Sequence, residues 1–251
     1  MTQKKHTVKT IQKMRDEGQI ITMLTAYDYP TAKQINDAGI DMILVGDSCA
    51  MVVHGHPNTL NATMDMMVLH CAAVARGCDR TMVVADMPFG SFQYGIEETM
   101  RNAARFVTEA KVDAVKFEAT PNHIEKTRAI VEMGIAVVGH VGLHPQAVGA
   151  LGGLSTQGKT VETARKVVRE ALALQEAGVF AIIFDQQNIN GFLLFCHRLA
   201  RNGQVSGAGT PLRIIAASPS YWNARIGERP TILRTAQTGF EFTPLRMVQT
   251  P

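Results

Sequence analysis

The sequence predicts an α/β protein built as a (β/α)8 barrel, also called a TIM barrel. Short apolar runs, each bounded by glycine or a polar residue, recur along the chain and are typical of strands buried on both faces of a parallel sheet. Segments with helical spacing separate these runs, as the crossovers between parallel strands require. The length of 251 residues suits one barrel of this kind.

A recurring local phrase is the strongest of these signals. The copies are Asp37-Ala-Gly-Ile-Asp, Glu109-Ala-Lys-Val-Asp, Glu132-Met-Gly-Ile-Ala and Glu176-Ala-Gly-Val-Phe. Each phrase joins the end of a helical pattern, capped by glycine or a substitute, to the start of an apolar run. Copies spaced tens of residues apart indicate a repeated strand-helix unit. A doubly wound open sheet is the alternative, but no GxGxxG phrase follows any predicted strand.

The elements are predicted in chain order from period and end signals. A short helix containing Val8, Ile11 and Met14 is expected to cover the floor of the barrel, and residues 49–62 are expected to form a long loop. Thr63 and Thr160 are candidate N-caps. The predicted strands cover residues 20–26, 42–48, 81–86, 114–118, 136–141 and 181–185. The predicted crossover helices cover residues 30–38, 63–76, 96–110, 122–133 and 160–178.

Beyond Asp185 the pattern weakens. One helix is predicted at residues 192–199 and one strand at 212–217, whereas residues 218–251 show little periodicity and are interpreted as turns. The barrel needs two more strand-helix units, so the C-terminal part is predicted to be atypical and, by this pattern, incomplete. We therefore divide the chain into a barrel region, 1–185, and a divergent segment, 186–251, for which the sequence leaves the degree of order open.

Composition excludes several classes of function. The net charge of +3, without a basic stripe interleaved with aromatics, argues against nucleic acid as a partner. No run approaches the length of a membrane span, and the first residues lack a signal-peptide core. Four cysteines show no metal-binding spacing and are predicted to be reduced thiols in a cytosol-like compartment; they are Cys49, Cys71, Cys78 and Cys196.

Acidic residues stand at the ends of three neighbouring predicted strands. Asp47 follows Met42-Ile-Leu-Val-Gly, Asp86 ends the run from Thr81, and Glu118 ends the run from Ala114. The carboxyl ends of parallel strands meet at one end of a barrel, where catalytic groups gather. A set of oxygen ligands suits Mg²⁺, which also keeps several of its waters. The alternative for each acid is that it caps the helix that follows.

Three further residues are candidates for contacts with a substrate. Lys116 lies two positions before Glu118, so both side chains leave the strand on the same face, and an inward lysine could stabilise a developing negative charge. The alternative is an outward lysine between helices. Ser48 could bind a carboxylate or simply cap a helix. His140 could contact a ligand or be a core histidine with its hydrogen bonds satisfied.

At this point the chain resembles a known family, the ketopantoate hydroxymethyltransferases. The resemblance covers about residues 7–185. The phrases that carry it, in the family's order, are Thr22-Met-Leu-Thr-Ala-Tyr-Asp-Tyr, Leu44-Val-Gly-Asp-Ser, Val83-Val-Ala-Asp-Met-Pro-Phe-Gly-Ser, Ala114-Val-Lys-Phe-Glu, Gly139-His-Val-Gly-Leu and Gly152-Gly-Leu-Ser-Thr-Gln-Gly-Lys. It implies a barrel of the phosphoenolpyruvate/pyruvate type and transfer of a one-carbon unit from 5,10-methylenetetrahydrofolate to 3-methyl-2-oxobutanoate, which gives 2-dehydropantoate for pantothenate synthesis.

The resemblance also implies roles for individual residues. Asp47, Asp86 and Glu118 fall on the family's magnesium-site positions. The residues at positions that contact the oxo acid or line its site in the family are Asp47, Ser48, Asp86, Lys116 and His140. The family further implies a homo-oligomer, often a decamer, with small-molecule substrates and neither nucleic acid nor membrane as a partner. The implied compartment is the cytosol in bacteria and the mitochondrion in many eukaryotes.

The chain departs from the family at the end of the sixth predicted strand. Asp185 stands where the family has a glutamate as its proposed catalytic base, and the loss of one methylene of reach can lower a rate by about 10²-fold. The family's following Val-Pro pair is replaced by Gln186-Gln, and its later Ile-Gly-Ile-Gly-Ala-Gly strand is only faintly matched at residues 207–209. Two alternatives therefore stay open: a magnesium-dependent lyase or mutase of the isocitrate lyase type, and a catalytically dead variant.

Overall fold

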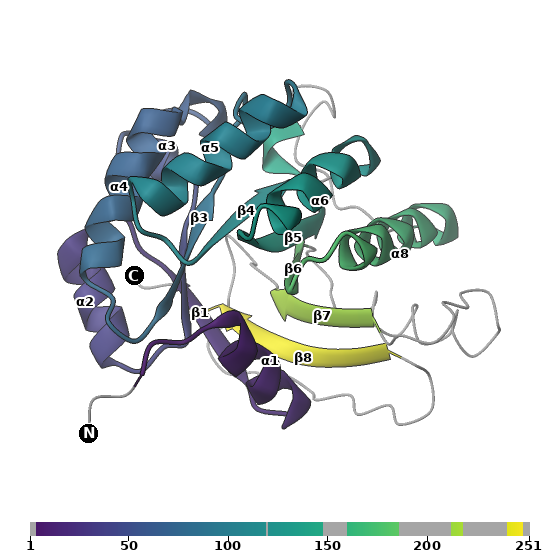
Figure 1. Ribbon diagram of the computed structural model, residues 1–251, viewed down its shortest axis with the longest axis horizontal. Coiled ribbons are helices and arrows are strands. Elements are labelled where there is room, and N and C mark those ends of the chain that lie inside the picture. Colours follow the sequence, from purple (N-terminus) through teal and green to yellow (C-terminus); the bar gives the residue numbers. More distant parts are fainter. Residues whose placement is uncertain (1–3, 119, 148–159, 186–211, 218–239, 248–251) are drawn as a thin grey trace.

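The computed structural model describes residues 4–118, 120–147, 160–185, 212–217 and 240–247. Eight parallel strands form one sheet in the order β6-β5-β4-β3-β2-β1-β8-β7. β6 and β7, the two ends of that order, lie beside each other, so the sheet curls into a barrel with helices outside it (Figure 1). This confirms the predicted fold class. The strands are β1 Ile21–Thr25, β2 Met42–Val45, β3 Met82–Asp86, β4 Ala114–Glu118, β5 Ala136–Gly142, β6 Ala181–Asp185, β7 Leu212–Ala217 and β8 Phe240–Met247.

Two helices, α4 and α8, begin directly after the N-caps that the sequence predicts, because side-chain caps fix their first turns. Thr63 accepts from the backbone N–H of Met66 at the start of α4, and Thr160 forms a reciprocal capping pair with Thr163 at the start of α8. The α-helices are α1 Val8–Asp16, α2 Tyr29–Asp37, α3 Cys49–Val52, α4 Met64–Arg76, α5 Ile96–Thr108, α6 Ile124–Glu132 and α8 Val161–Glu176. Short 3₁₀ turns are η1 Thr59–Asn61, η2 Pro121–His123 and η3 Pro145–Ala147.

The strands separate two apolar layers, since successive side chains point to opposite faces. Inside the barrel lies a cluster that includes Met42, Val84, Ala114 and Val138. Ile11 of α1 belongs to this interior cluster, so α1 closes the floor of the barrel as expected.

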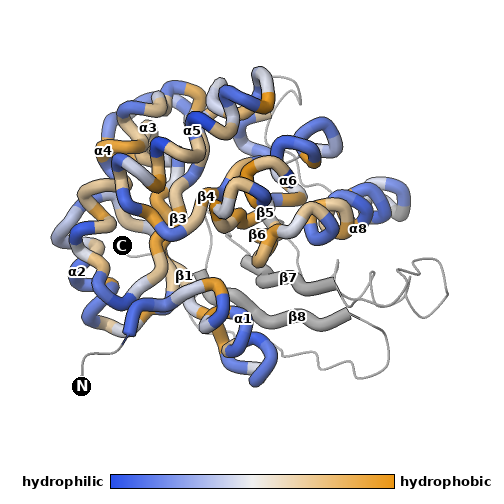
Figure 2. Tube along the Cα trace, viewed as in Figure 1, coloured by the Kyte–Doolittle hydropathy of each residue, from blue (hydrophilic) through white to orange (hydrophobic). Residues whose placement is uncertain are grey.

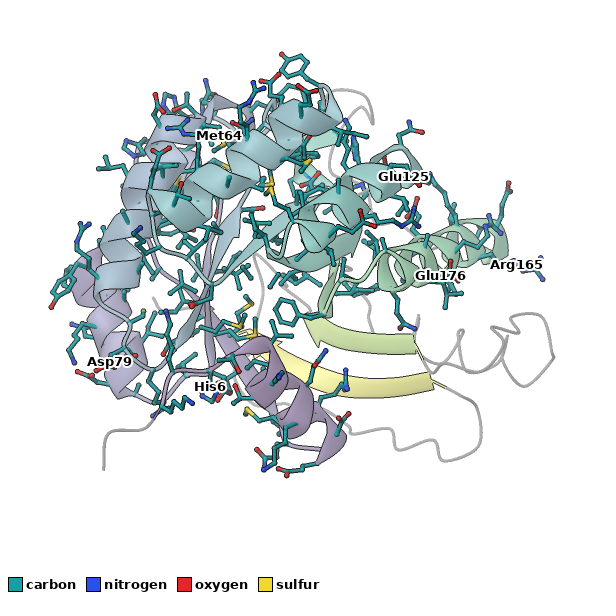
Figure 3. All side chains as sticks on the ribbon, in the orientation of Figure 1. His6, Met64, Asp79, Glu125, Arg165 and Glu176 are labelled. Atoms are coloured by element: carbon teal, nitrogen blue, oxygen red, sulfur yellow. The ribbon has the colours of Figure 1, made fainter. Side chains whose placement is uncertain are left out.

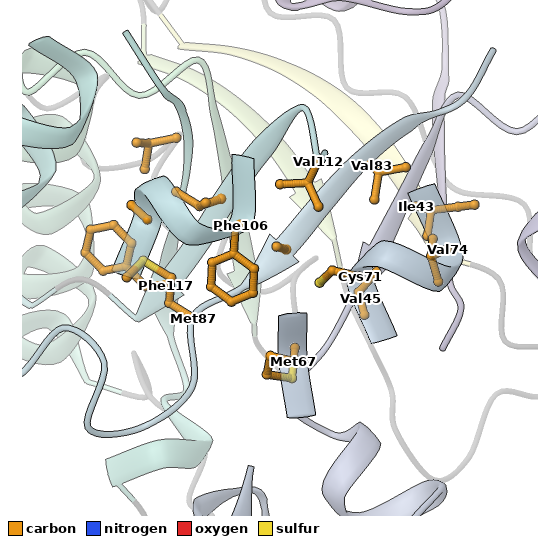
Figure 4. Close-up of a cluster of buried hydrophobic side chains, with 14 of the residues drawn as sticks. Ile43, Val45, Met67, Cys71, Val74, Val83, Met87, Phe106, Val112 and Phe117 are labelled. Atoms are coloured by element: carbon orange, nitrogen blue, oxygen red, sulfur yellow. The ribbon is translucent and has the colours of Figure 1, made fainter. Parts of the chain in front are cut away.

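The second and larger layer lies between the sheet and the outer helices. Figure 4 shows part of it, in which Phe106 of α5 and Val74 of α4 face Val83 and Phe117 from the strands. Hydropathy along the trace follows this arrangement, with apolar residues in β2 to β6 and polar residues along the outer helices (Figure 2). Charged residues of α6 and α8, such as Glu125, Arg165 and Glu176, project away from the sheet (Figure 3).

The recurring phrase of the sequence has a structural role at the floor of the barrel. Its aspartate accepts a hydrogen bond from the backbone of the preceding strand: Asp41 from the N–H of Thr22 at 2.8 Å, and Asp113 from the N–H of Val83 at 2.8 Å. In each case the carboxylate satisfies an N–H group near the start of that strand. In the two copies that end in aspartate, the phrase therefore joins the new strand to the one before it.

Two expectations about irregular regions are wrong. The predicted long loop, 49–62, contains helix α3 and turn η1. Residues 218–251 were expected to hold no strand, yet β8 lies there and pairs in parallel with both β1 and β7. Its pattern was missed because Pro244 interrupts it, and proline ordinarily argues against a strand with neighbours on both sides. β7 has the predicted bounds, whereas the helix predicted at 192–199 lies outside the described residues.

The helices and thiols complete this picture. In the described part of the chain, no helix combines the length and apolar character needed to cross a membrane. Cys49, Cys71 and Cys78 are free and buried. Burial raises the pKa of Cys49 to about 12 and that of Cys78 to about 11. Cys196 lies outside the described residues.

Candidate active site

The candidate site lies inside the barrel, at the carboxyl ends of β2 to β5. Inward positions recur at every second residue, and in β4 they run from Ala114 in the interior cluster to Lys116 and then Glu118. Asp86 and His140 each follow an inward valine of that cluster by two residues. All four side chains are buried, as the strand pattern requires.

A buried ion pair forms the centre of the site. Lys116 Nζ lies 2.9 Å from Asp86 Oδ1, and the two residues are 5% and 3% exposed. Burial raises the pKa of Asp86 to about 7; the charge of Lys116 lowers it and that of Asp47 raises it. For Lys116, burial lowers the pKa, but the charges of Asp86, Asp47 and Glu118 outweigh burial and raise it overall. The lysine is therefore charged, whereas the pKa of Asp86 lies near neutral pH.

A residue that the sequence analysis did not single out links the other two acids. Gln146, in η3, donates through Nε2 to Asp47 Oδ2 at 2.9 Å and to the carbonyl of Met87 at 3.0 Å. Its backbone N–H lies 3.2 Å from each carboxylate oxygen of Glu118. The only sequence signal was an amide after Pro145 in the turn that follows the fifth strand, and neither helical nor strand period could reveal its partners.

The pKa of Glu118 is also displaced, to about 8. Burial is the largest cause, whereas Lys116 and the backbone N–H of Gln146 both lower it and Asp47 and Asp86 raise it. The backbone N–H of Asp47 lies 3.3 Å from Asp86 Oδ2, which connects the first acid to the second. The three acids predicted from the strand ends thus belong to one hydrogen-bonded network.

His140 lies beside the ion pair as a neutral imidazole. Burial and the nearby charge of Lys116 hold the pKa of His140 well below its usual value. Its Nδ1 is 3.5 Å from Lys116 Nζ, where it can accept a hydrogen bond. His144 donates to the carbonyl of His140 at 3.3 Å, and burial lowers the pKa of His144 to about 4. The site therefore has one permanent cation, Lys116, surrounded by groups that can be neutral.

Ser48 lies at the rim of this network. Its hydroxyl is 2.8 Å from that of Tyr27, a residue that the sequence analysis did not single out as a site residue. Ser48 occupies the N-cap position of α3 but makes no capping hydrogen bond with its side chain. The interpretation of Ser48 as a simple helix cap is therefore wrong, and its hydroxyl faces Tyr27 instead.

The capping alternative also fails for the three acids. The N-cap residues of the elements that follow them are Ser48 for α3, Gly95 for α5 and Thr120 for η2. The outward alternative for Lys116 fails as well, because Val115 and Phe117 are the residues of β4 that pack against the helices. The three acids therefore do not act as helix caps, and Lys116 does not point outward between the helices.

Asp185, the predicted base, ends β6. Its backbone is in register with Gly142 at the end of β5, which places it at the same end of the barrel as the other candidates. Its side chain lies outside the described residues, so its role as a base stays a prediction.

The donor set suits a cation that keeps its waters. Over the described ranges, no three His, Cys, Asp or Glu side chains lie close enough together to enclose a metal ion. Mg²⁺ commonly needs only one or two direct carboxylate ligands and holds water in its other positions. Asp47, Asp86 and Glu118 supply oxygen atoms of this type, and Gln146 Oε1 is buried with no hydrogen-bond partner among the described residues.

Comparison with known proteins decides the family. The sequence matches the ketopantoate hydroxymethyltransferase family over residues 5–189. The chain belongs to this family. Similar proteins include 3-methyl-2-oxobutanoate hydroxymethyltransferase 2, mitochondrial, of Oryza sativa subsp. japonica, which is 51% identical over 180 residues. Another is the 3-methyl-2-oxobutanoate hydroxymethyltransferase of Acetivibrio thermocellus, 51% identical over 181 residues.

These matches cover part of each ketopantoate hydroxymethyltransferase relative. The alignments include 71% and 72% of this chain, but 45% of the Oryza protein and 64% of the Acetivibrio protein. The chain thus matches about half to two thirds of the length of these relatives. Both the family match and the point at which the motifs are lost, near Asp185, agree with the resemblance deduced from the phrases.

Solved structures share the barrel of this ketopantoate hydroxymethyltransferase family member. Phosphoenolpyruvate phosphomutase from Streptomyces platensis aligns with a TM-score of 0.63 at 14% identity, covering 95% of this chain and 80% of that one. Phosphonopyruvate hydrolase, solved with oxalate and Mg²⁺, aligns with a TM-score of 0.59 at 18% identity, covering 84% of this chain and 72% of that one. Identities this low establish the common fold alone.

Proposed function

We propose that the chain transfers a hydroxymethyl group from 5,10-methylenetetrahydrofolate to 3-methyl-2-oxobutanoate and forms 2-dehydropantoate. Membership of the family supports this assignment. The observation that carries it is the buried Lys116–Asp86 pair, with Asp47 and Glu118 joined to the same network. Such a site can bind an oxo acid and stabilise negative charge where water is excluded.

Mg²⁺ is the proposed cofactor, held by Asp47, Asp86 and Glu118. When bound, it draws electrons from the keto oxygen of the substrate and so acidifies the neighbouring C3–H bond. The hydroxyl of Ser48 would donate to the substrate carboxylate, and the ammonium of Lys116 would face the keto oxygen as negative charge develops there. Neutral His140 would complete the hydrogen bonds around the oxo acid.

Asp185 is the proposed base. It would take the C3 proton, after which C3 forms a bond to the methylene carbon of the folate. Both C–N bonds of that carbon, to N5 and N10, break; water supplies the hydroxyl, and the proton from C3 and the remaining proton of the water end on the two nitrogens. A carboxylate suits this task when its pKa lies near the working pH, which burial can achieve. The missing methylene, relative to the family's glutamate, predicts slow proton transfer.

The test is exchange of the C3 proton of 3-methyl-2-oxobutanoate in D₂O, followed by NMR. We expect loss of the C3–H signal that needs both the protein and Mg²⁺, and 2-dehydropantoate only after the folate is added. Asp185→Asn is expected to lower the exchange rate at least tenfold. A folded chain that gives no exchange with Mg²⁺ present would refute the proposal and favour the catalytically dead variant.

The lyase alternative finds no support in the thiols. Lyases of the isocitrate lyase type carry a cysteine in a Lys-Lys-Cys-Gly-His-like phrase, and this sequence has no such phrase. Cys49, Cys71 and Cys78 are also buried. Burial holds the pKa of each of these thiols above its ordinary value. Buried thiols with raised pKa values are poor acids and poor nucleophiles.

We further propose that the chain forms a homo-oligomer, as the family implies. Three consecutive apolar side chains are exposed at the end of α3: Met51 at 39%, Val52 at 65% and Val53 at 49%. Exposed apolar side chains of this kind favour contacts between protein surfaces. Sedimentation velocity should give a species several times the 27.3 kDa of one chain; a monomer at all concentrations would contradict this. The compartment proposed is the cytosol in a bacterium and the mitochondrion in a eukaryote.

A further inference from the structure

Gln146 makes more contacts with the acids than any residue predicted for the site. Its backbone N–H donates to Glu118, and its side-chain amide donates to Asp47 Oδ2 and to the carbonyl of Met87. One residue in a three-residue turn, η3, therefore fixes two carboxylates that belong to different strand ends. Gln146 is itself only 4% exposed.

The orientation of the amide follows from its partners. A carboxylate oxygen and a carbonyl oxygen can only accept hydrogen bonds, so the atom that faces both must be the NH₂ group. The carbonyl oxygen, Oε1, consequently points elsewhere. It is buried and has no hydrogen-bond partner within the described ranges. A buried acceptor without a donor is costly, and such atoms in folded proteins call for an explanation.

The surrounding charges indicate which donor Oε1 awaits. The amide of Gln146 lies against Asp47, and its backbone lies against Glu118, so an anionic group would be repelled at this position once these carboxyl groups are deprotonated. A hydrated divalent cation is attracted instead, and its bound waters are strong hydrogen-bond donors. Groups that hold metal ligands or waters in place tune affinity as the ligands themselves do.

We propose that Gln146 is a positioning residue of the cation site: it holds Asp47 and Glu118 in place and, through Oε1, accepts a hydrogen bond from a water of the bound ion. This inference rests on the proposed function, since it needs the divalent cation. It extends that proposal to a residue outside the predicted ligand set.

Binding of Mn²⁺ to the purified chain, followed by the EPR signal of the free ion and by competition with Mg²⁺, tests the inference without any activity assay. Gln146→Met keeps the side-chain length and the backbone N–H to Glu118 but removes both amide groups. We expect Mn²⁺ to bind about 10- to 100-fold more weakly. Gln146→Asn, which withdraws the amide by one methylene and remains polar, should weaken binding at least tenfold.

The matched control is Asn36→Leu. Asn36 is another buried amide, which donates to Asp79 and accepts from the backbone N–H groups of Arg80 and Thr81, near the opposite ends of the strands. Its loss should lower the melting temperature while Mn²⁺ affinity stays within threefold of the native value. Native affinity in both Gln146 variants would overturn the inference and leave the proposed function intact. No Mn²⁺ or Mg²⁺ binding by the native chain would overturn the cation site itself.

Discussion

Lys116 lies with three acids in a space from which water is largely excluded. The ammonium of Lys116 pairs with Asp86 at 2.9 Å, and its positive charge is balanced by the carboxylates around it. Burial favours the neutral forms of Asp86 and Glu118, and it raises the pKa of Asp86 to about 7 and that of Glu118 to about 8. The charge state of the site therefore changes with pH between about 7 and 8, where Asp86 and Glu118 titrate.

Lys116→Met should destabilise the protein most at alkaline pH. Removing one partner of a buried ion pair leaves the other charge uncompensated, at a cost of about 3–5 kcal/mol. Since Lys116 lowers the pKa of Asp86, its removal also lets Asp86 take up a proton more readily. Urea unfolding should show a loss of about 3 kcal/mol at pH 8 and a smaller loss at pH 6.

The double variant Lys116→Met with Asp86→Asn is the control for this prediction. It leaves no buried charge at the pair, so most of the lost free energy of unfolding should return at pH 8. A double variant as unstable as Lys116→Met alone would mean that packing, rather than charge, explains the loss.

Stability should depend on pH in a definite direction when divalent ions are absent. Asp86 and Glu118 have folded pKa values of about 7 and about 8, and both lie above the unfolded values. Between the unfolded and the folded pKa values, the native state therefore binds more protons than the unfolded chain. Stability therefore rises as the pH falls from 8.5 to about 6.5. Below about 6.5 the buried His140 and His144, whose pKa values are lowered, stay neutral in the native state while the unfolded chain takes up protons. This loss offsets the further gain from Asp86 and Glu118, which continues down to their unfolded pKa values, so stability levels off.

Thermal unfolding measured across this range checks the prediction. The melting temperature should rise as the pH falls from 8.5 to about 6.5 and change little just below that, and saturating Mg²⁺ should stabilise the protein more at pH 8.5 than at pH 6.5, because the ion requires deprotonated carboxylates. A melting temperature that rises steadily from pH 6.5 to 8.5 in the absence of metal would contradict the assignment of these pKa shifts.

Much of the site could be predicted at this scale, and the reason is strand alternation. Asp86, Lys116 and Glu118 are fixed to the interior by a period of two that the sequence displays. Gln146 and Tyr27 could not be predicted, because their partners lie on other segments and no local pattern records such contacts. Asp47, which follows Gly46 beyond the end of β2, was predictable from its place after the strand.

At the scale of elements, close backbone approaches set the positions of the helices. The end of α4 lies against the start of α2, and a Cβ atom added to Gly77 would meet the carbonyl oxygen of Tyr29 at 2.9 Å and the Cβ of Ala32 at 3.0 Å. The φ angle of Gly77, −82°, is open to any residue. This position therefore requires glycine because there is no room for a Cβ atom between the two helices.

Gly77→Ala should consequently destabilise the protein, by about 1–3 kcal/mol, since backbone atoms cannot move aside as a flexible side chain can. Gly95→Ala is the matched control: Gly95 is the N-cap of α5, its φ is −72°, and an added Cβ would have no neighbour within 4 Å. Urea unfolding of the two variants should differ by at least 1 kcal/mol. Equal stability of both would exclude the helix contact as the cause.

Element boundaries were predicted well where caps and apolar runs coincide. β4, β6 and β7 have their predicted bounds, and α4 begins after the predicted cap, Thr63. The failures, α3 and β8, share a cause. α3 is a single turn, too short for a helical period to register, and β8 contains a proline that breaks the strand pattern.

At the scale of the whole molecule, the barrel is closed by its last described strand. β8 pairs with β1 on one side and with β7 on the other, so the segment beyond residue 185 contributes two strands to the same sheet as the family motifs. The sequence could not predict this closure, because pairing between distant segments leaves no local signal. It predicted the number of strands that the barrel needs but not where the last one lies.

Truncation after residue 239 tests the importance of this closure. Removing β8 leaves β1 paired with β2 on one side and unpaired on the other, and an unpaired apolar strand edge promotes association between chains. We expect a lower melting temperature and aggregates in size-exclusion chromatography. A shortened chain with the native melting temperature and elution volume would mean that β8 is dispensable.

The pairing of β1 with β8 also has a consequence for how the protein is made. Met23 and Met247 are partners in the sheet although they are more than two hundred residues apart. During synthesis on the ribosome, the first strand must wait for residue 247 to emerge before its free edge is covered. One edge of the first strand therefore stays unpaired for most of translation. Such an edge is prone to aggregation, so we expect the nascent chain to depend on chaperones that shield it.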